Sequence, residues 1–221
     1  MFTGIIETIG TVEHSESRGG DIRLGIACGE LDLSHTRLGD SIAVNGVCLT
    51  AIAFHGQTFM ADVSAETMSK TSLGQISVGS PVNLETALTL NTALGGHLVS
   101  GHVDGLATLI EMQADARSTR YRFEVEPAIQ HYIATKGSVT IDGTSLTVNN
   151  VDGNQFDVNI VPHTQQKTVF QYYQDGSRVN VEVDIIARYL ERLLQGRADA
   201  STVKDQQILE TLIKSGFINH E

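Results

Sequence analysis

The chain has 221 residues and a formal net charge of −11 at pH 7. This acidic balance argues against nucleic acid as a partner, because a phosphate backbone requires a basic face. No apolar run reaches the roughly 18 residues of a membrane span. The two cysteines, Cys28 and Cys48, lack metal-ligand spacing, and no secretory leader precedes the first strand-like segment, so we expect a reduced, cytoplasmic protein.

The first part of the chain predicts short strands separated by turns. The six predicted strands cover residues 4–12, 22–26, 41–44, 48–54, 57–63 and 82–86. Gly10 suggests a bulge or a close backbone approach, residues 15–21 a polar turn, His55-Gly56 a hairpin, and residues 65–73 a short helix or loop. This spacing favours an antiparallel barrel or sandwich, and a barrel suits a small ligand at an open end.

One stretch of this segment occurs twice. Residues 45–50 (NGVCLT) are followed 97 residues later by residues 142–147 (DGTSLT). The same offset pairs residues 3–6 with 100–103, 62–67 with 159–164, and 79–85 with 176–182. One register maintained over several segments indicates a tandem duplication, and the period is too long for a solenoid repeat.

The second copy repeats the strand pattern of the first. We predict strands at residues 102–111, 119–125, 138–141, 145–151, 154–160 and 178–184. Residues 91–97 connect the copies, Asp152-Gly153-Asn154 is a hairpin signal, and residues 127–134 predict a short helix over one barrel mouth.

After the second copy the period becomes helical. Apolar side chains at 185, 186, 189, 190, 193 and 194 form a stripe, which packs either on the chain's own barrel or against copies of itself. A second helix is predicted over residues 203–215, with a capping box at 202–205 and Gly216 at its end. The predicted fold is mainly β, with two tandem six-stranded antiparallel barrels (1–97 and 98–184) and a C-terminal helical segment (185–221).

The residues that could bind or react belong to the repeated blocks. The sequence has no Walker loop, dinucleotide fingerprint, zinc spacing or nucleophile elbow, so we expect no metal site. Gly4 and Gly101 permit close approach to the backbone, and Thr50 and Thr147 offer hydroxyls for the polar edge of a heterocycle. For any single threonine, β-propensity is the favoured explanation, and the functional interpretation depends on the set that both copies retain.

The two copies also differ at positions suited to chemistry. Ile5, Cys48 and Glu66 in the first correspond to His102, Ser145 and His163 in the second. Core filling is an alternative for Cys48, and a structural hydrogen bond is one for His102. Asp184 ends the last strand, where a helix N-cap is the alternative.

At these residues the chain resembles riboflavin synthase of the duplicated lumazine-binding kind. The motifs are Met1–Ile5, 45–50, 94–105, 137–147 and 161–164, and the likeness covers about residues 1–195. The resemblance implies two six-stranded Greek-key barrels and a helix through which three chains associate. It also implies dismutation of two 6,7-dimethyl-8-ribityllumazine molecules without a cofactor, and lumazine synthase is a further candidate partner.

The resemblance also assigns residues to two pockets. The first is expected to be lined by Gly4, Ile5, Ile6, Ser41, Val47, Cys48, Leu49, Thr50, Asp62, Val63, Ser64, Ala65, Glu66 and Thr67. The second is expected to be lined by Gly101, His102, Val103, Ser145, Leu146, Thr147, Asn159, Ile160, Val161, Pro162, His163 and Thr164, with Lys136 from another chain. The expected catalytic residues are Ser41, Cys48, His102, Ser145 and Asp184.

Two other functions compete with this enzyme. One is a non-catalytic relative that binds a lumazine or flavin as a chromophore, and the other is an oligomerising scaffold. Both copies retain the glycine, Leu-Thr and terminal threonine positions, which favours the enzyme over either alternative.

Overall fold

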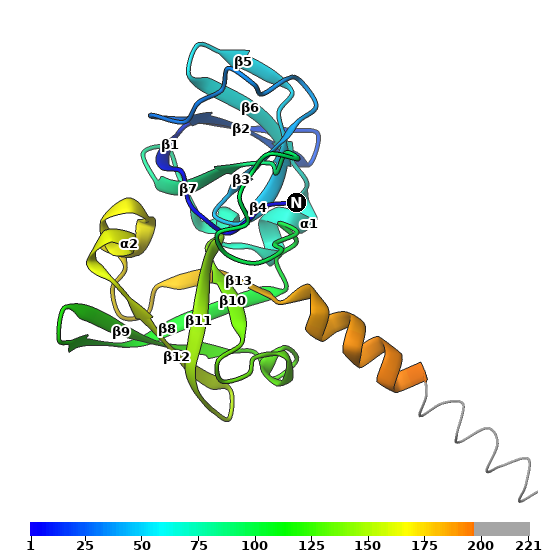
Figure 1. Ribbon diagram of the computed structural model, residues 1–221. Coiled ribbons are helices and arrows are strands. Elements are labelled where there is room, and N and C mark those ends of the chain that lie inside the picture. Colours follow the sequence, from blue (N-terminus) through cyan, green and yellow to red (C-terminus); the bar gives the residue numbers. More distant parts are fainter. Residues whose placement is uncertain (197–221) are drawn as a thin grey trace, which may run out of the picture. The chain divides into compact units, whose positions relative to one another are not determined.

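The computed structural model describes residues 1–196 and is mainly β (Figure 1). The strands of the first repeat are β1 (Thr8–Arg18), β2 (Asp21–Ala27), β3 (Ser41–Val44), β4 (Val47–Thr50), β5 (Ala53–His55), β6 (Thr58–Val63) and β7 (Pro81–Thr86). Those of the second are β8 (Gly105–Asp115), β9 (Ser118–Val125), β10 (Ser138–Ile141), β11 (Thr144–Asp152), β12 (Gln155–Ile160) and β13 (Arg178–Val183). The short helices are α1 (Ala65–Lys70) and α2 (Pro162–Lys167), with 3₁₀ turns η1 (Ser72–Gln75), η2 (Gln130–Tyr132) and η3 (Val169–Tyr172).

The second repeat is a closed six-stranded barrel. Its strand order is β10-β11-β12-β9-β8-β13, with antiparallel pairing throughout. The β8–β9 hairpin and the β10–β11–β12 meander are joined by the β9–β12 pair, which gives the predicted Greek-key barrel.

The first repeat follows the same course but its ladder is interrupted. Its seven strands run in the order β4-β3-β7-β1-β2-β6-β5, so β4 and β5 are the two edges. Only Ala51 and Ile52 separate these edge strands, so Thr50 and Ala53 lie at most about 11 Å apart and the sheet curls until its edges approach each other. β11 has an irregular register between Val148 and Asn150, the positions equivalent to Ala51 and Ala53. The predicted single strand 48–54 is therefore two strands.

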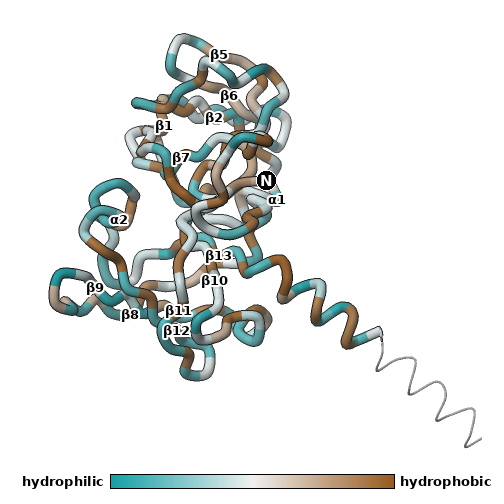
Figure 2. The backbone as a smooth tube through the Cα atoms, in the orientation of Figure 1, coloured by the Kyte–Doolittle hydropathy of each residue, from teal (hydrophilic) through white to brown (hydrophobic). Residues whose placement is uncertain are grey.

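Each repeat has its own apolar core, built by side chains that alternate along the strands. In β6, Phe59, Ala61 and Val63 are buried, while Asp62 is exposed. In the second repeat Tyr121, Phe123, Phe156 and Phe170 fill the barrel, with ring centroids 5.2–6.4 Å apart. Figure 2 shows the resulting alternation of hydrophobic and hydrophilic residues along the backbone.

Two hairpin turns join the repeats. Asn45-Gly46 between β3 and β4, and Asp142-Gly143 between β10 and β11, have positive φ at both residues, as type I′ turns require. The side-chain amide of Asn83 donates to the Asp142 carbonyl at 2.8 Å, and that of Asn180 donates to the Asn45 carbonyl at 2.8 Å. Residues at equivalent positions of the two repeats therefore make equivalent contacts with the opposite repeat.

Several predicted boundaries differ from the structure. β1 starts at Thr8 and continues to Arg18, so the predicted turn at 15–21 shrinks to Gly19-Gly20. The bulge lies between Val12 and His14, because there the β1–β2 register shifts. Gly10 instead permits a close approach, since a Cβ on it would lie 2.5 Å from the Leu84 side chain and 2.6 Å from the Ala27 carbonyl.

The chain divides into a unit of Met1–Asp184 and a second unit that starts at Ile185. Residues 185–196 are helical, as the apolar stripe predicted. Ile186, Tyr189, Leu190, Leu193 and Leu194 on this helix are 56–68% exposed. The helix predicted at 203–215 lies outside the described residues.

Candidate active site

Two backbone segments exchange contacts between the repeats. Phe2 and Val99 form an antiparallel bridge, which sets residues 2–4 beside residues 99–101. The Ser145 amide donates to the Gly4 carbonyl at 2.7 Å, and the Cys48 amide donates to the Gly101 carbonyl at 2.9 Å. Each segment therefore pairs with the strand of the opposite repeat, and we call these two places the Ser145 junction and the Cys48 junction.

A buried glutamate on the last strand of each repeat holds the segment in place. Glu85 accepts from the amide and hydroxyl of Thr3 at 2.6 Å and from the Gly4 amide at 3.0 Å. Glu182 accepts from Ser100 and Gly101 at the same distances. Burial raises the pKa of both carboxyls, and the hydrogen bonds from the segments oppose that rise.

This crossing, in which residues 2–4 and 99–101 each pack on the opposite repeat, changes the predicted grouping of the pocket residues. Gly4 and Ile5 were expected beside Cys48, and Gly101 and Val103 beside Ser145. A Cβ on Gly4 would lie 2.6 Å from Ser145 Cβ, while one on Gly101 would lie 2.7 Å from Cys48 Cβ. Val103 packs against the core of the first repeat. That grouping was wrong, because equal spacing within a repeat does not reveal which repeat a terminal segment packs on.

Strand alternation sorts the predicted lining residues of β4 and β11. Val47 and Leu49 are buried in the first core, whereas Cys48 is half-buried and Thr50 exposed on the other face. In β11, Leu146 packs against the second core. Ser145 is half-buried and Thr147 is exposed. Val63 and Ile160 are also core residues. Their side chains face the interior, so only their backbone is available to a ligand.

The Ser145 junction contains a histidine that the sequence interpretation did not select. His97 Nδ1 lies 2.7 Å from Ser145 Oγ. Burial lowers the pKa of His97, and the negative charge of Asp184 opposes this effect. Gly95 and Gly96 precede His97 in the connection between the copies, and a Cβ on Gly96 would lie only 2.7 Å from Ser145 Cβ.

His102 follows Gly101 and is exposed, so it stands beside the Cys48 junction. Lys136 is exposed in a turn with φ +67°. Ser41 pairs with Thr50 across β3 and β4. It also lines a hollow of about 380 Å³ that contains Glu7, Asp40 and Thr86.

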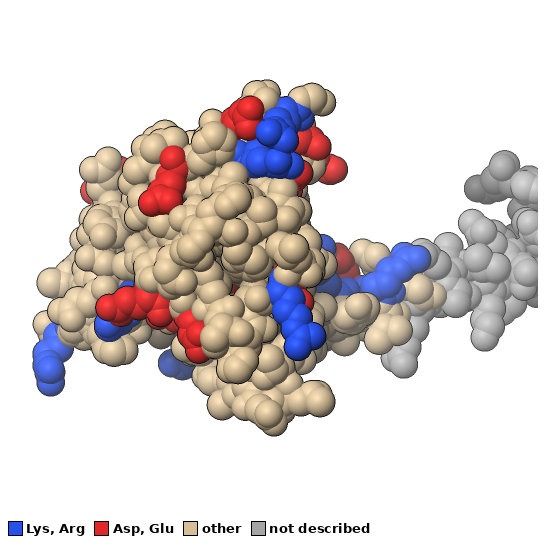
Figure 3. All heavy atoms as spheres, turned by 90° about the horizontal axis from the view of Figure 1, so that it is seen from above, with Lys and Arg blue, Asp and Glu red and all other residues tan. Residues whose placement is uncertain are grey.

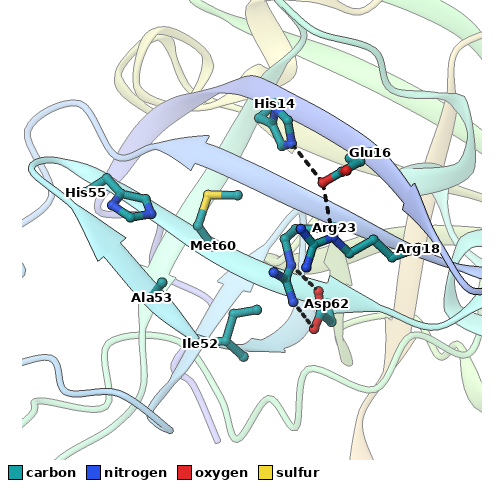
Figure 4. A pocket seen from close by; sticks show the side chains of 9 residues that line it. All are labelled: His14, Glu16, Arg18, Arg23, Ile52, Ala53, His55, Met60 and Asp62. Atoms are coloured by element: carbon teal, nitrogen blue, oxygen red, sulfur yellow. Dashed lines mark hydrogen bonds and ion pairs between the residues drawn. The ribbon is translucent and has the colours of Figure 1, made fainter.

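Asp62 occupies a different face from the one expected. Its carboxylate receives two 2.7 Å hydrogen bonds from Arg23 on β2 and lines a hollow of about 510 Å³ with His14, His55 and Met60 (Figure 4). The guanidinium lowers the pKa of Asp62. The equivalent Asn159 donates to Asp115 at 3.0 Å. Both side chains are thus held by neighbouring strands on the outside of the sheet.

The helices after β6 and β12 carry the remaining predicted residues. Ser64 caps α1, where its hydroxyl accepts from the Thr67 amide at 3.1 Å and lies 3.0 Å from the Thr67 hydroxyl. Ala65 and Glu66 are exposed in its first turn. At α2 the cap position is Val161, without a side-chain cap, and Pro162 starts the helix. His163 is exposed and Thr164 is half-buried.

The surface charges and the possible metal ligands of the described residues do not point to a further site. On the face drawn in Figure 3, the Lys and Arg side chains of the described residues stand singly or beside acidic ones. Within residues 1–196, no group of three or more His, Cys, Asp or Glu side chains could hold a metal ion. No helix in this described part of the chain is long and apolar enough to cross a membrane.

The chain resembles lumazine-related proteins in sequence and in structure. The model of the lumazine binding domain matches residues 3–87 and again residues 100–184. A riboflavin synthase of Photobacterium phosphoreum is 44% identical over 219 residues, covering 99% of this chain and all of that protein. A riboflavin synthase of Bacillus subtilis is 40% identical, covering 98% of this chain and all of its own length.

The fold is also similar to that of LumP in complex with riboflavin, with a TM-score of 0.76 and 22% identity over 83% of this chain and all of that chain. LumP in complex with 6,7-dimethyl-8-(1'-D-ribityl) lumazine gives a TM-score of 0.73 over 83% of this chain and 99% of that chain. This second likeness concerns the fold alone. The two domain matches and the full-length relatives show that the chain belongs to the riboflavin synthase family and carries the lumazine-binding domain twice.

Proposed function

We propose that this chain is a transferase that dismutates two molecules of 6,7-dimethyl-8-ribityllumazine. One molecule gives a four-carbon unit to the other, which yields riboflavin and 5-amino-6-ribitylamino-2,4(1H,3H)-pyrimidinedione. The atoms of the two products equal those of the two substrates, so the reaction needs no external oxidant or reductant and no added cofactor.

The two crossed junctions carry this proposal. Both present a half-buried polar side chain beside a positive-φ glycine, on the same backbone frame, yet one side chain is Cys48 and the other is Ser145. Two identical substrates with different roles require sites that bind alike and react differently. Proximity and orientation of the two reactants can supply about 7–11 kcal/mol of the barrier in favourable systems.

The remaining chemistry is proton transfer at a lumazine methyl group and polar assistance at the ring of the second molecule. Cys48 and His102 at one junction, and Ser145 and Asp184 at the other, are our candidates for these roles, with Ser41 beside Thr50. The domains are proposed as 1–97, 98–184 and 185–221. Thr50, Thr67, Thr147 and Thr164 are proposed to bind the substrate.

Association into a homotrimer through the helix at 185–194 is part of the same proposal. Five large apolar side chains of this helix are more than half exposed, which supports burial against other copies. In such a trimer the first barrel of one chain would face the second barrel of a neighbour, and Lys136 would reach a neighbouring site. We further propose a cytoplasmic location and lumazine synthase as a partner.

The test is incubation of the purified chain with the lumazine in buffer free of metal and nucleotide, followed by measurement of riboflavin. Turnover supports the enzyme. Stoichiometric binding without turnover would support a chromophore carrier, and absence of binding would exclude both ligand functions.

A further inference from the structure

The carboxylate of Glu182, on the last strand of the second repeat, belongs to the Cys48 junction. Its Oε1 accepts from the amide and the hydroxyl of Ser100, both at 2.6 Å, and its Oε2 accepts from the Gly101 amide at 3.0 Å. Only 4% of Glu182 is exposed, so water does not compete for these bonds. Three donors match the ionised carboxylate, because in that form both oxygens are acceptors only.

Two further hydrogen bonds connect the segment that Glu182 holds to residues suited to chemistry. The Gly101 carbonyl accepts from the Cys48 amide at 2.9 Å. The Ser100 hydroxyl, which donates to Glu182, also accepts from the His102 amide at 3.3 Å. One buried carboxylate therefore fixes the backbone of Cys48 in the first repeat and that of His102 in the second.

The packing around Gly101 leaves little room for a shift of this segment. A Cβ on Gly101 would lie 2.7 Å from Cys48 Cβ and 2.7 Å from the ring of the buried Phe2. Any displacement of residues 100–101 must consequently move Cys48 or His102 as well. In enzymes a misplacement of about 1 Å can lower the rate about 100-fold.

We propose that Glu182 is a positioning residue that sets the distance between the side chains of Cys48 and His102. The carboxylate itself is buried behind the segment, and it acts by holding residues 100–101 so that both side chains face one ligand. This inference rests on the proposed dismutation, in which Cys48 and His102 belong to one site. It makes that site dependent on β13 of the opposite repeat.

The molecule contains a matched control for Glu182. Glu85, at the equivalent position of the first repeat, accepts from Thr3 and Gly4 at the same three distances. The segment that Glu85 holds contacts Ser145 rather than Cys48, because the Gly4 carbonyl accepts from the Ser145 amide. Loss of either carboxylate should therefore cost similar stability, whereas only loss of Glu182 should disturb Cys48.

The experiment compares Glu182→Gln with wild type, with Glu85→Gln and with Glu30→Gln, in which an exposed glutamate after β2 is changed. The glutamine amide turns one acceptor into a donor that faces an N–H group. We expect kcat of Glu182→Gln to fall about 10- to 100-fold, with a change in KM below about fivefold. Glu30→Gln should leave both constants unchanged.

Alkylation by iodoacetamide, located by mass spectrometry, reports on Cys48 without the need for turnover. We expect Cys48 to react at least about threefold faster in Glu182→Gln than in wild type, because the segment that packs on it is loosened. In Glu85→Gln the rate should stay at the wild-type value, although urea unfolding should show a similar loss of stability in both variants.

A pair of changes at Ser100 tests the same link while leaving the carboxylate in place. Ser100→Ala removes the hydroxyl between Glu182 and His102, and we expect kcat to fall about 10-fold. Ser100→Thr keeps the hydroxyl, as Thr3 does in the first repeat, and should recover most of that rate.

The proposal is overturned if Glu182→Gln keeps more than about a third of wild-type kcat. Equal alkylation rates of Cys48 in Glu182→Gln and Glu85→Gln, or equal kcat values for Ser100→Ala and Ser100→Thr, would overturn it as well. Failure of the proposed function would appear separately, as absence of riboflavin formation by wild type, and the alkylation rates would still test how Cys48 is held.

Discussion

Gly46 and Gly143 face each other backbone to backbone where the two repeats meet. A Cβ on Gly46 would lie 2.6 Å from the Gly143 amide nitrogen, and one on Gly143 would lie 2.8 Å from the Gly46 amide nitrogen. The φ values of Gly46 and Gly143 are +76° and +79°. The glycines of the repeated stretch therefore serve two purposes, because they allow the type I′ turns and they let the repeats touch.

Replacing Gly46 with alanine is expected to destabilise the chain by roughly 2–4 kcal/mol, the sum of backbone strain and steric displacement of the facing turn. Gly56→Ala is the matched control, because Gly56 also has positive φ (+63°) but has nothing within 4 Å. Urea unfolding should show the control losing only about 1 kcal/mol. Equal losses would contradict a tight contact between the turns.

Any change of the Asn180 side-chain amide is expected to lower the stability of the chain. Its amide donates to the Asn45 carbonyl at 2.8 Å and its oxygen accepts from the Ser72 amide at 2.6 Å. Asn180→Asp keeps the acceptor but loses the donor and places a charge in a buried site, which should cost about 2–4 kcal/mol. Asn91→Asp is the surface comparison, because Asn91 is exposed, and chemical denaturation is the measurement. A cost below about 0.5 kcal/mol for Asn180→Asp would refute this role.

The stability of the chain should depend on pH through Asp142. Burial raises the pKa of this carboxyl from 3.8 to about 7, against the hydrogen bonds from Tyr173 and the Asn180 amide. In the unfolded chain Asp142 ionises near 3.8, whereas in the native chain it stays protonated until about pH 7. Its stabilising contribution is therefore complete below pH 3.8 and is lost as the pH rises to about 7.

The variant Asp142→Asn isolates this effect, because Asn45 is the residue at the equivalent position. Its stability advantage over wild type should grow with pH, by up to about 4 kcal/mol between pH 4 and pH 8. Unfolding curves at these two pH values measure the difference. An advantage independent of pH would mean that Asp142 does not titrate in this range.

The crossing of the segments predicts selective effects on amide exchange. Gly4→Ala should increase the hydrogen exchange rate of the Ser145 amide, which donates to the Gly4 carbonyl, and should affect the Cys48 amide less. Gly101→Ala should do the reverse, so each variant is the control of the other. Hydrogen exchange followed by NMR would reject the crossing if Gly4→Ala mainly affected the Cys48 amide and Gly101→Ala mainly affected the Ser145 amide.

The helix at 185–196 offers a test of association. Replacing Leu190 and Leu193 with serine should convert a trimer into monomers, because it removes apolar side chains that are 56% and 67% exposed. Sedimentation equilibrium gives the mass. A monomer with both leucines intact would show that the trimer is wrong.

The duplication made most of the fold predictable from the sequence. A strand pattern found twice in one register predicts two similar barrels, and the Asn45-Gly46 and Asp142-Gly143 hairpins follow from local turn chemistry. The split between β4 and β5 could not be predicted, since the interruption at Ala51 and Ile52 depends on how the sheet curls.

The site was predicted less completely. The offset of 97 residues selected Gly4, Gly101, Cys48 and Ser145 as candidates, but it did not show that residues 2–4 and 99–101 exchange partners. His97 was missed because it lies in the connection between the repeated blocks, where the comparison of copies gives no signal. Its proximity to Ser145 depends on long-range packing of Gly96 against Thr3.

The proposed dismutation requires two lumazine molecules to react with each other on this chain. The most direct measurement is the molar ratio of riboflavin formed to lumazine consumed, with purified protein in buffer that contains neither metal nor nucleotide. We expect one riboflavin and one pyrimidinedione for every two lumazines. Saturable binding of lumazine without riboflavin formation would contradict it.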